Sequence, residues 1–317
     1  MKDIIKELPI PITGLMLGLA AAGNLVLSYG EIYRNIFWSL SAVILGLIVL
    51  KIVMFPKDLR AALDNVVVAS VFPTLSMSIM ILSTYLRPFS YGISNTLWLA
   101  GVILHMGIIA FFTYKYVLDF NIESVFPSWF IVYVGIVVGS ITAPAFNKFK
   151  MGQVIFYFGF ISLLILLPIV LKRVYMVKDI PEPALPTLAI QTAPAALCLA
   201  GYMNSFLDKN MGMVYFLLIL SQCLFLIVLT QLPRLLKLKF SPAYSAFTFP
   251  FVITGISIKL TNGFLLKADK EISILKYIVK FEEFLAIALV FYVLYRYIKF
   301  MFNKVSKSNE YKVIEEN

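Results

Sequence analysis

The chain has little charge, little cysteine and almost no histidine. Only 14% of its 317 residues are Asp, Glu, Lys or Arg, and it contains two cysteines and one histidine. One histidine argues against most zinc and haem chemistry and leaves little room for a Ser/His/Asp set. The sequence also contains no HExxH, GxSxG or Walker motif. We therefore expect no enzyme activity, no cofactor and no metal.

Cys198 and Cys223 both fall within long apolar runs, so neither a disulfide framework nor a thiolate metal site is indicated. The central portions of these runs also lack Asp, Glu, Lys and Arg, the residues that mark ion paths in pumps and coupled carriers. Glu282 and Glu283 lie near the start of the last run, and we expect them to reach the membrane surface as a snorkelling pair. For His105 we expect a hydrogen bond to a neighbouring helix.

Hydrophobic residues make up 61% of the chain and the mean hydropathy is +0.90, values that predict an integral membrane protein in a lipid bilayer. Although the net charge is +10, the basic residues lie between apolar runs and form no nucleic-acid motif, so no nucleic-acid partner is expected. Ten runs are long enough to span a bilayer. They lie near residues 8–29, 36–54, 64–86, 92–114, 124–146, 151–171, 185–207, 211–233, 241–262 and 277–300. We expect a single pore domain over residues 1–303 and a short cytoplasmic tail over residues 304–317.

The positive charge is distributed unevenly between the two sides of the predicted membrane domain. Of the 27 Lys and Arg residues, 17 lie at the termini and in the loops on one side, which places both termini in the cytoplasm. Lys259 and the four lysines that follow it supply half of the outer positive charge. These lysines either form an ordinary solvated loop or weakly attract anions to the outer face of the membrane.

Prolines and small residues favour the odd-numbered spans. Within these odd-numbered spans Phe-Pro occurs at 72–73, 126–127 and 249–250, and small residues accompany the prolines. Proline and glycine are common in membrane helices in general, which explains how many there are but not why they favour alternate spans. The pattern predicts an all-α fold of five hairpins, with odd helices inside and even helices outside. The pore-lining or helix-kink candidates are Gly14, Gly18, Pro73, Ser76, Pro127, Gly135, Pro194 and Pro250.

Pro250 lies within the ninth apolar span and should bend its helix. Phe249 immediately precedes it and is the largest apolar group at the predicted kink, so it could close a passage there. The alternative is that Phe249 is a core or lipid-facing aromatic residue.

Four segments carry a resemblance to a known family. They are LPIPITGLMLGLAAAG (8–23), FPSWFIVYVG (126–135), LPTLAIQTAPAALCLAGY (185–202) and SPAYSAFTFPF (241–251). In this order across ten spans, they resemble the tellurite-resistance/dicarboxylate transporter family, which includes the plant slow anion channels.

The resemblance implies a homotrimer in the plasma or inner membrane, each subunit having a pore inside five odd helices. It also implies that Phe249 is the pore gate and that Gly14 leaves room for its ring. The function expected first is an anion channel or channel-like exporter for chloride, nitrate or C4-dicarboxylates, with Lys259 in the outer vestibule. The alternatives are a secondary carrier for dicarboxylate, sulfite or a drug/metabolite, and a membrane scaffold that transports nothing.

Overall fold

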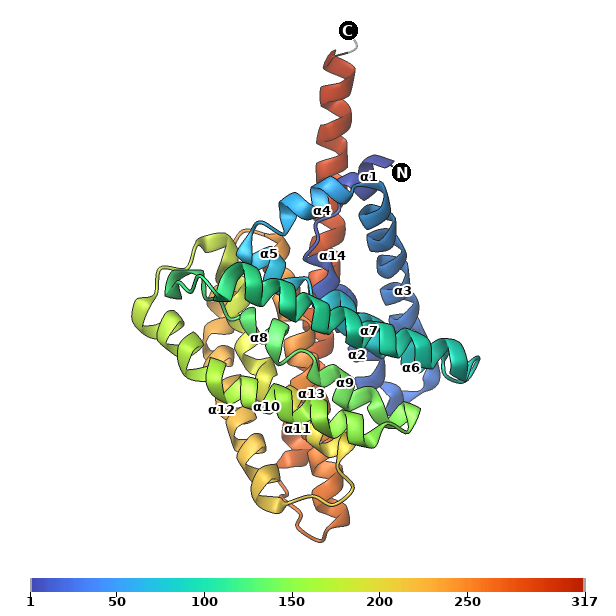
Figure 1. Ribbon diagram of the computed structural model, residues 1–317, viewed down its shortest axis with the longest axis vertical. Coiled ribbons are helices and arrows are strands. Elements are labelled where there is room, and N and C mark those ends of the chain that lie inside the picture. Colours follow the sequence, from blue (N-terminus) through green and yellow to red (C-terminus); the bar gives the residue numbers. More distant parts are fainter. Residues whose placement is uncertain (1, 316–317) are drawn as a thin grey trace.

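The computed structural model describes residues 2–315, and all regular structure within that range is helical (Figure 1). The first half contains α1 (Lys2–Glu7), α2 (Ile12–Leu25), η1 (Leu27–Tyr29), α3 (Glu31–Met54), α4 (Pro56–Ala62), α5 (Val66–Val71), α6 (Thr74–Leu86), α7 (Tyr91–Phe112), η2 (Thr113–Val117), η3 (Ile122–Ser124), α8 (Trp129–Tyr133), α9 (Val137–Thr142) and η4 (Ala143–Phe146). The second half contains α10 (Phe149–Leu171), η5 (Lys172–Val177), η6 (Glu182–Thr192), α11 (Ala193–Ser205), α12 (Met211–Leu235), η7 (Pro242–Phe247), α13 (Phe249–Lys267) and α14 (Leu275–Glu315).

Seven helical segments of the described chain are long and apolar enough to cross a membrane. They are Glu31–Met54, Val66–Leu86, Tyr91–Val117, Phe149–Val177, Glu182–Ser205, Met211–Leu235 and Pro242–Lys267. Two shorter apolar helices, Ile12–Leu25 and Val137–Phe146, fall within the first and fifth predicted spans. The prediction of an all-helical membrane protein is confirmed, whereas the arrangement of ten spans as five hairpins stays a prediction. The division at residue 304 also stays a prediction, since α14 continues to Glu315 and residues 316–317 lie outside the described range.

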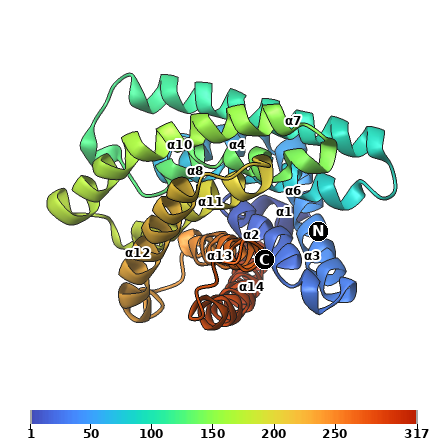
Figure 2. The same ribbon diagram turned by 90° about the horizontal axis from the view of Figure 1, so that it is seen from below.

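Burial divides these segments into two groups. In the most apolar 18-residue stretch of the third, seventh and ninth predicted spans, 78%, 94% and 61% of the residues are buried. Helix α2 of the first span is buried almost throughout. In the corresponding stretches of the second, fourth, sixth and eighth spans, only 28–39% of the residues are buried. Figure 2 shows the same division in space, with α2, α8, α11 and α13 inside and α3, α7, α10, α12 and α14 around them.

The inner segments are broken, and the outer helices are long. Helices α3, α7, α10 and α12 each run for 22 to 25 residues, whereas the inner segments change helix type or direction near prolines. Pro73 precedes the first residue of α6, and Pro194 lies in the first turn of α11. A proline at a helix start sacrifices no helical hydrogen bond, because the first N–H groups have no partner within the helix.

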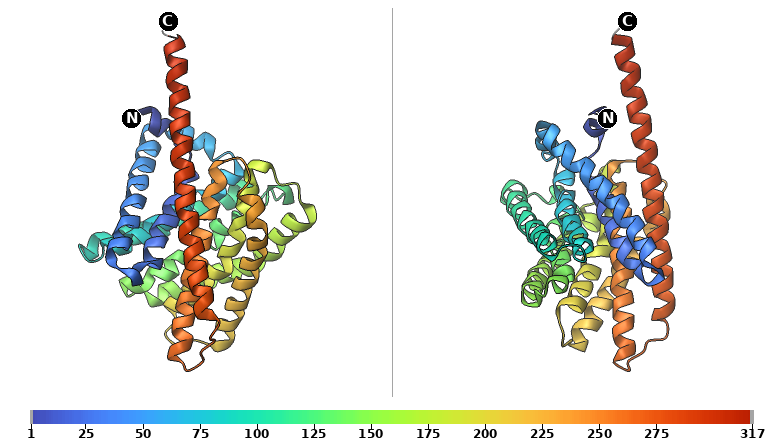
Figure 3. Two further views of the ribbon diagram at one scale, coloured as in Figure 1. Left: turned by 180° about the vertical axis from the view of Figure 1, so that it is seen from behind. Right: turned by 90° about the vertical axis from the view of Figure 1, so that its right-hand side faces the viewer.

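Pro250 also lies at the start of a helix, so the expected bend at this residue was wrong. Pro250 was expected to bend a continuous helix, but the chain is instead interrupted at Thr248, whose φ and ψ are −102° and −89°. The 3₁₀ segment η7 ends before Thr248, and α13 begins at Phe249 with Pro250 in its first turn. On the outer side α14 packs against α13 and α2, and its C-terminal end projects beyond the other helices (Figure 3).

Candidate functional site

A small cavity lies where the five inner segments meet. Its volume is about 30 Å³, enough for about one water molecule. All five odd-numbered spans contribute to its wall, and no Asp, Glu, Lys or Arg is among the residues that line it. Those residues are Gly14, Leu17, Val71, Thr74, Met77, Phe130, Ile131, Val134, Gly135, Thr187, Ile190, Ala193, Pro194, Leu197, Ala243, Ser245, Ala246, Phe249 and Pro250.

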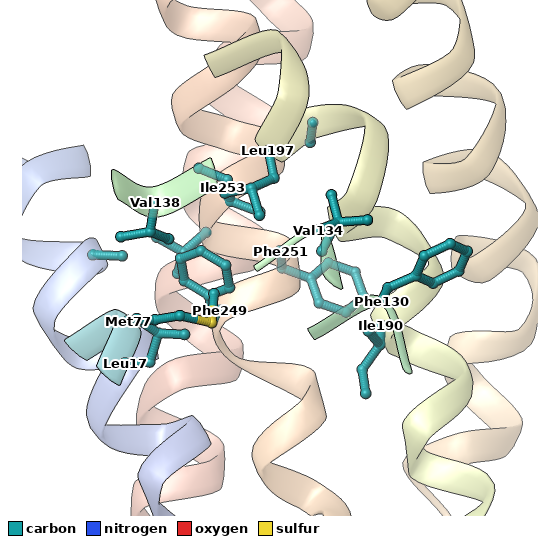
Figure 4. Packing of buried hydrophobic residues seen from close by; sticks show 14 of the residues in the cluster. Leu17, Met77, Phe130, Val134, Val138, Ile190, Leu197, Phe249, Phe251 and Ile253 are labelled. Carbon is teal, nitrogen blue, oxygen red and sulfur yellow. The ribbon is translucent and has the colours of Figure 1, made fainter. Parts of the chain in front are cut away.

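Phe249 is the first residue of α13, and it is 5% exposed. Figure 4 shows its ring beside Leu17 and Met77, with the ring of Phe251 pointing to the other side. The ring of Phe251 instead meets Phe225 of α12 edge-on, at a centroid distance of 6.0 Å. Of these two phenylalanines, therefore, only Phe249 presents its side chain to the cavity.

Hydrogen bonds fix the residue before Phe249. The Thr248 hydroxyl lies 3.0 Å from the Gly14 carbonyl oxygen and 2.7 Å from that of Ser245, so it can donate to either. Gly14 itself leaves almost no spare room, because a Cβ atom there would lie 2.8 Å from the Ser245 hydroxyl oxygen. The neighbour directly against Gly14 is therefore Ser245, and Gly14 and Phe249 line the same cavity.

Four of the pore-lining or kink candidates line the cavity, namely Gly14, Gly135, Pro194 and Pro250. The other four, Gly18, Pro73, Ser76 and Pro127, are not among its lining residues. Gly18 is packed against Thr248, and a Cβ atom added there would lie only 2.5 Å from the Thr248 Cβ atom.

Ser76 turns toward the outer helix α7. Its hydroxyl oxygen lies 2.8 Å from Nδ1 of His105, and Nε2 of the same ring donates to the Val132 carbonyl oxygen at 3.0 Å. The expected hydrogen bond between His105 and a neighbouring helix is thus confirmed, and it joins α7 to both α6 and α8. Because Ser76 is used in this contact, its side chain is not available to the cavity.

Lys259 does not project freely into solvent. Its amine donates to the Leu25 carbonyl oxygen at 2.9 Å and to the Ser28 hydroxyl at 2.8 Å, and it forms an ion pair with Glu283 of α14. Tyr29 donates to the other oxygen of Glu283 at 2.9 Å. The positive charge of Lys259 is therefore balanced by a carboxylate, and its proposed role at the outer mouth stays a prediction.

Glu282 and Glu283 do not reach the membrane surface as expected. Glu283 is 7% exposed and Glu282 is 1% exposed, so the prediction of a snorkelling pair was wrong. Glu283 has Lys259 and Tyr29 as partners, whereas Glu282 has only the Gln222 amide beside it and forms no ion pair with a described residue.

Sequence reasoning missed the hydroxyl groups of the cavity wall. Thr74 donates to the Val71 carbonyl or to Thr13, and Thr187 donates to the Ala184 carbonyl. These bonds occupy the hydroxyl hydrogens of the two threonines, which leaves Ser245 as the remaining hydroxyl group of the wall. The available signal was the position of each threonine immediately after a proline, Pro73 and Pro186.

A larger cavity opens beside the first one. Its volume is about 540 Å³, and Val71 and Ala243 line both cavities. Its other walls include the Pro9–Pro11 segment, Asn65 and Pro181, and no charged residue lines it. It lies at the end of the inner segments that carries the N-terminus, since Pro9, Ile10 and Pro11 are part of its wall.

The matching family model covers residues 7–300 and describes a voltage-dependent anion channel. The chain belongs to this family. The match confirms the resemblance to the tellurite-resistance/dicarboxylate transporter family and extends across all five inner segments. The protein is accordingly a multi-pass membrane protein of a transporter and anion-channel family.

Two curated relatives come from Methanocaldococcus jannaschii. The uncharacterized transporter MJ0762 is 25% identical over 271 residues, covering 74% of this chain and 75% of the relative. The uncharacterized transporter MJ0576 is 24% identical over 237 residues, covering 64% of this chain and 65% of the relative. Both relatives are named as transporters.

Proposed function

We propose that this family member is a passive anion channel or channel-like exporter whose pore runs along the inner segments and is closed by Phe249. The observation that carries the proposal is the shared wall of the 30 Å³ cavity, to which all five inner segments and Phe249 contribute. An anion cannot pass an apolar constriction of this size, since it would lose its water without gaining replacement ligands.

The proposed pore would bind anions weakly. No basic residue lines either cavity, and the hydroxyls of Thr74 and Thr187 donate to protein oxygens. Permeation would then rank anions mainly by the cost of removing their water, which favours chloride, nitrate and other monovalent anions over C4-dicarboxylates. Rapid passage is compatible with such weak binding.

The proposal also includes the membrane, the oligomeric state and the topology of the protein. We place the protein in the plasma or inner membrane as a homotrimer of ten-span subunits, with both termini in the cytoplasm. The alternation of buried and exposed segments supports an inner and an outer ring. The main alternative is a secondary carrier for dicarboxylate, sulfite or a drug/metabolite, because the curated relatives are named only as transporters.

Anion-replacement currents from the purified protein in liposomes test this function. The Phe249→Ala variant should carry a current whose reversal potential follows the chloride or nitrate gradient and that needs no gradient of a second ion. A carrier would instead show saturating, exchange-dependent flux and little current. Absence of anion flux from both the wild type and Phe249→Ala, with the protein shown to be folded and inserted, would overturn the channel proposal.

A further inference from the structure

A third cavity, separate from the proposed pore, lies between the segment that precedes η7 and the part of α14 beyond residue 290. Its volume is about 460 Å³, and Phe240, Tyr292, Arg296, Lys299 and Asn303 are among its lining residues. Arg296, Lys299 and Asn303 follow one another at intervals of three and four residues, so they share one face of α14. The proposed anion path does not use this cavity.

Arg296 is held in place but is not neutralised. Its guanidinium carbon lies 4.8 Å from the ring centre of Tyr244, 5.6 Å from that of Phe240 and 5.5 Å from that of Tyr292. One guanidinium nitrogen donates to the Tyr292 hydroxyl. Neither Arg296 nor Lys299 forms an ion pair with any described residue.

These contacts leave a preorganised anion site. Arginine carries five N–H donors in a fixed plane, and the described residues that use donors of Arg296 are the two tyrosines Tyr292 and Tyr244. Stacking on aromatic rings orients the plane without using its remaining donors. A phosphate group could therefore take two parallel hydrogen bonds from Arg296 and a charge contact from Lys299.

The position of the cavity indicates where the phosphate comes from. The cavity lies toward the end of the molecule that carries the N-terminus, because Lys304, directly after Asn303, forms an ion pair with Glu7 of α1. Arg234 lies in the last turn of α12, and Lys237 and Lys239 lie in the connection that follows. Large apolar groups flank the basic pair, because Tyr295 is 59% exposed and Phe302 is 71% exposed. Cations beside exposed aromatic and apolar side chains match the headgroup and the adjoining acyl chains of a phospholipid.

We propose that the cavity lined by Arg296 and Lys299 binds the phosphate of an anionic phospholipid headgroup. The site is independent of whether the pore conducts. It touches the pore-forming segment through Tyr244, whose ring stacks near Arg296 and meets Phe247 edge-on at 5.2 Å.

The test uses the full-length protein purified in a neutral detergent. Its thermal midpoint is measured while phosphatidylglycerol, phosphatidylcholine or inorganic phosphate is added. Phosphatidylglycerol should raise the midpoint in a saturable way, and the other two should raise it little. Arg296→Gln and Lys299→Gln should each weaken the apparent affinity about fivefold, the effect expected for one basic residue near an anionic lipid.

Arg60→Gln is the matched control, because Arg60 is an exposed arginine of α4 that does not line the cavity. It should leave the phosphatidylglycerol effect unchanged. Equal effects of phosphatidylglycerol and phosphatidylcholine, or an equal loss in Arg60→Gln, would overturn the proposal. A full effect of inorganic phosphate would show a site for free phosphate instead of lipid. Lys299→Gln gives a decisive result even if Arg296→Gln fails to fold, since Lys299 is exposed.

Discussion

The hydroxyl of Thr248 lies 3.0 Å from the carbonyl oxygen of Gly14, although the two residues are 234 positions apart in the sequence. The contact ties the start of α13 to α2. One turn further along α2, Gly18 is also packed against Thr248 and lies near the backbone nitrogen of Phe249. Together these two glycines determine how closely the start of α13 approaches α2.

Gly18→Ala should therefore destabilise the protein by roughly 1–3 kcal/mol, because its methyl group would overlap Thr248 and force the start of α13 to move. Thermal unfolding in detergent measures the effect. Gly107→Ala is the matched control, since Gly107 also lies in a helix but has no heavy atom within 4 Å of an added Cβ atom. Its stability should be unchanged or up to about 1 kcal/mol higher. Equal stability of the two variants would refute the close contact at Gly18.

Glu283→Gln tests whether Lys259 influences anions near the outer mouth. Removing the carboxylate leaves the positive charge of Lys259 unbalanced. Anion current through a Phe249→Ala background should then rise about twofold at low ionic strength and return to the background value at high salt.

Tyr29→Phe is the control for this charge effect. It removes the hydrogen bond to Glu283 but keeps the ion pair with Lys259, so the current should not change. An unchanged current in Glu283→Gln at low salt would mean that Lys259 lies too far from the anion path to affect it.

Glu282→Gln should raise the thermal stability, by roughly 1–2 kcal/mol, because the carboxylate of Glu282 is buried without an ion-pair partner among the described residues and has only the Gln222 amide beside it. The amide keeps nearly the same shape and carries no charge. Glu283→Gln is the adjacent comparison and should lower stability, since it leaves Lys259 without its ion-pair partner. A loss of stability in Glu282→Gln would show that the carboxylate stabilises the fold, and would contradict the prediction.

Much of the fold could be predicted from the sequence, because each membrane-spanning helix requires a long apolar run. The ten apolar runs fall on helical segments, and the alternation of prolines predicted which segments are buried. The sequence also predicted that Phe249 lies among the inner segments, since Phe-Pro recurs in them. What it did not predict is the break at Thr248, because proline is compatible with both a bend and a helix start.

The remaining site details depended on contacts between distant helices. Ser76 lies in an inner segment, but only the packing of α6 against α7 directs it to His105. Lys259 and Glu283 lie 24 residues apart, and their pairing requires the turn between α13 and α14. The periodicity of one helix does not reveal which neighbour lies against each of its faces.

The measurement that tests the account most directly is the macroscopic anion current of Phe249→Ala compared with Phe247→Ala and Phe251→Ala at equal surface expression. Phe249 lines the central cavity, whereas Phe247 meets Tyr244 and Phe251 meets Phe225. The account predicts a large gain of current in Phe249→Ala, an intermediate gain in Phe249→Leu, and wild-type current in the other two variants. An unaltered current in Phe249→Ala, or an equal gain in Phe251→Ala, would contradict it.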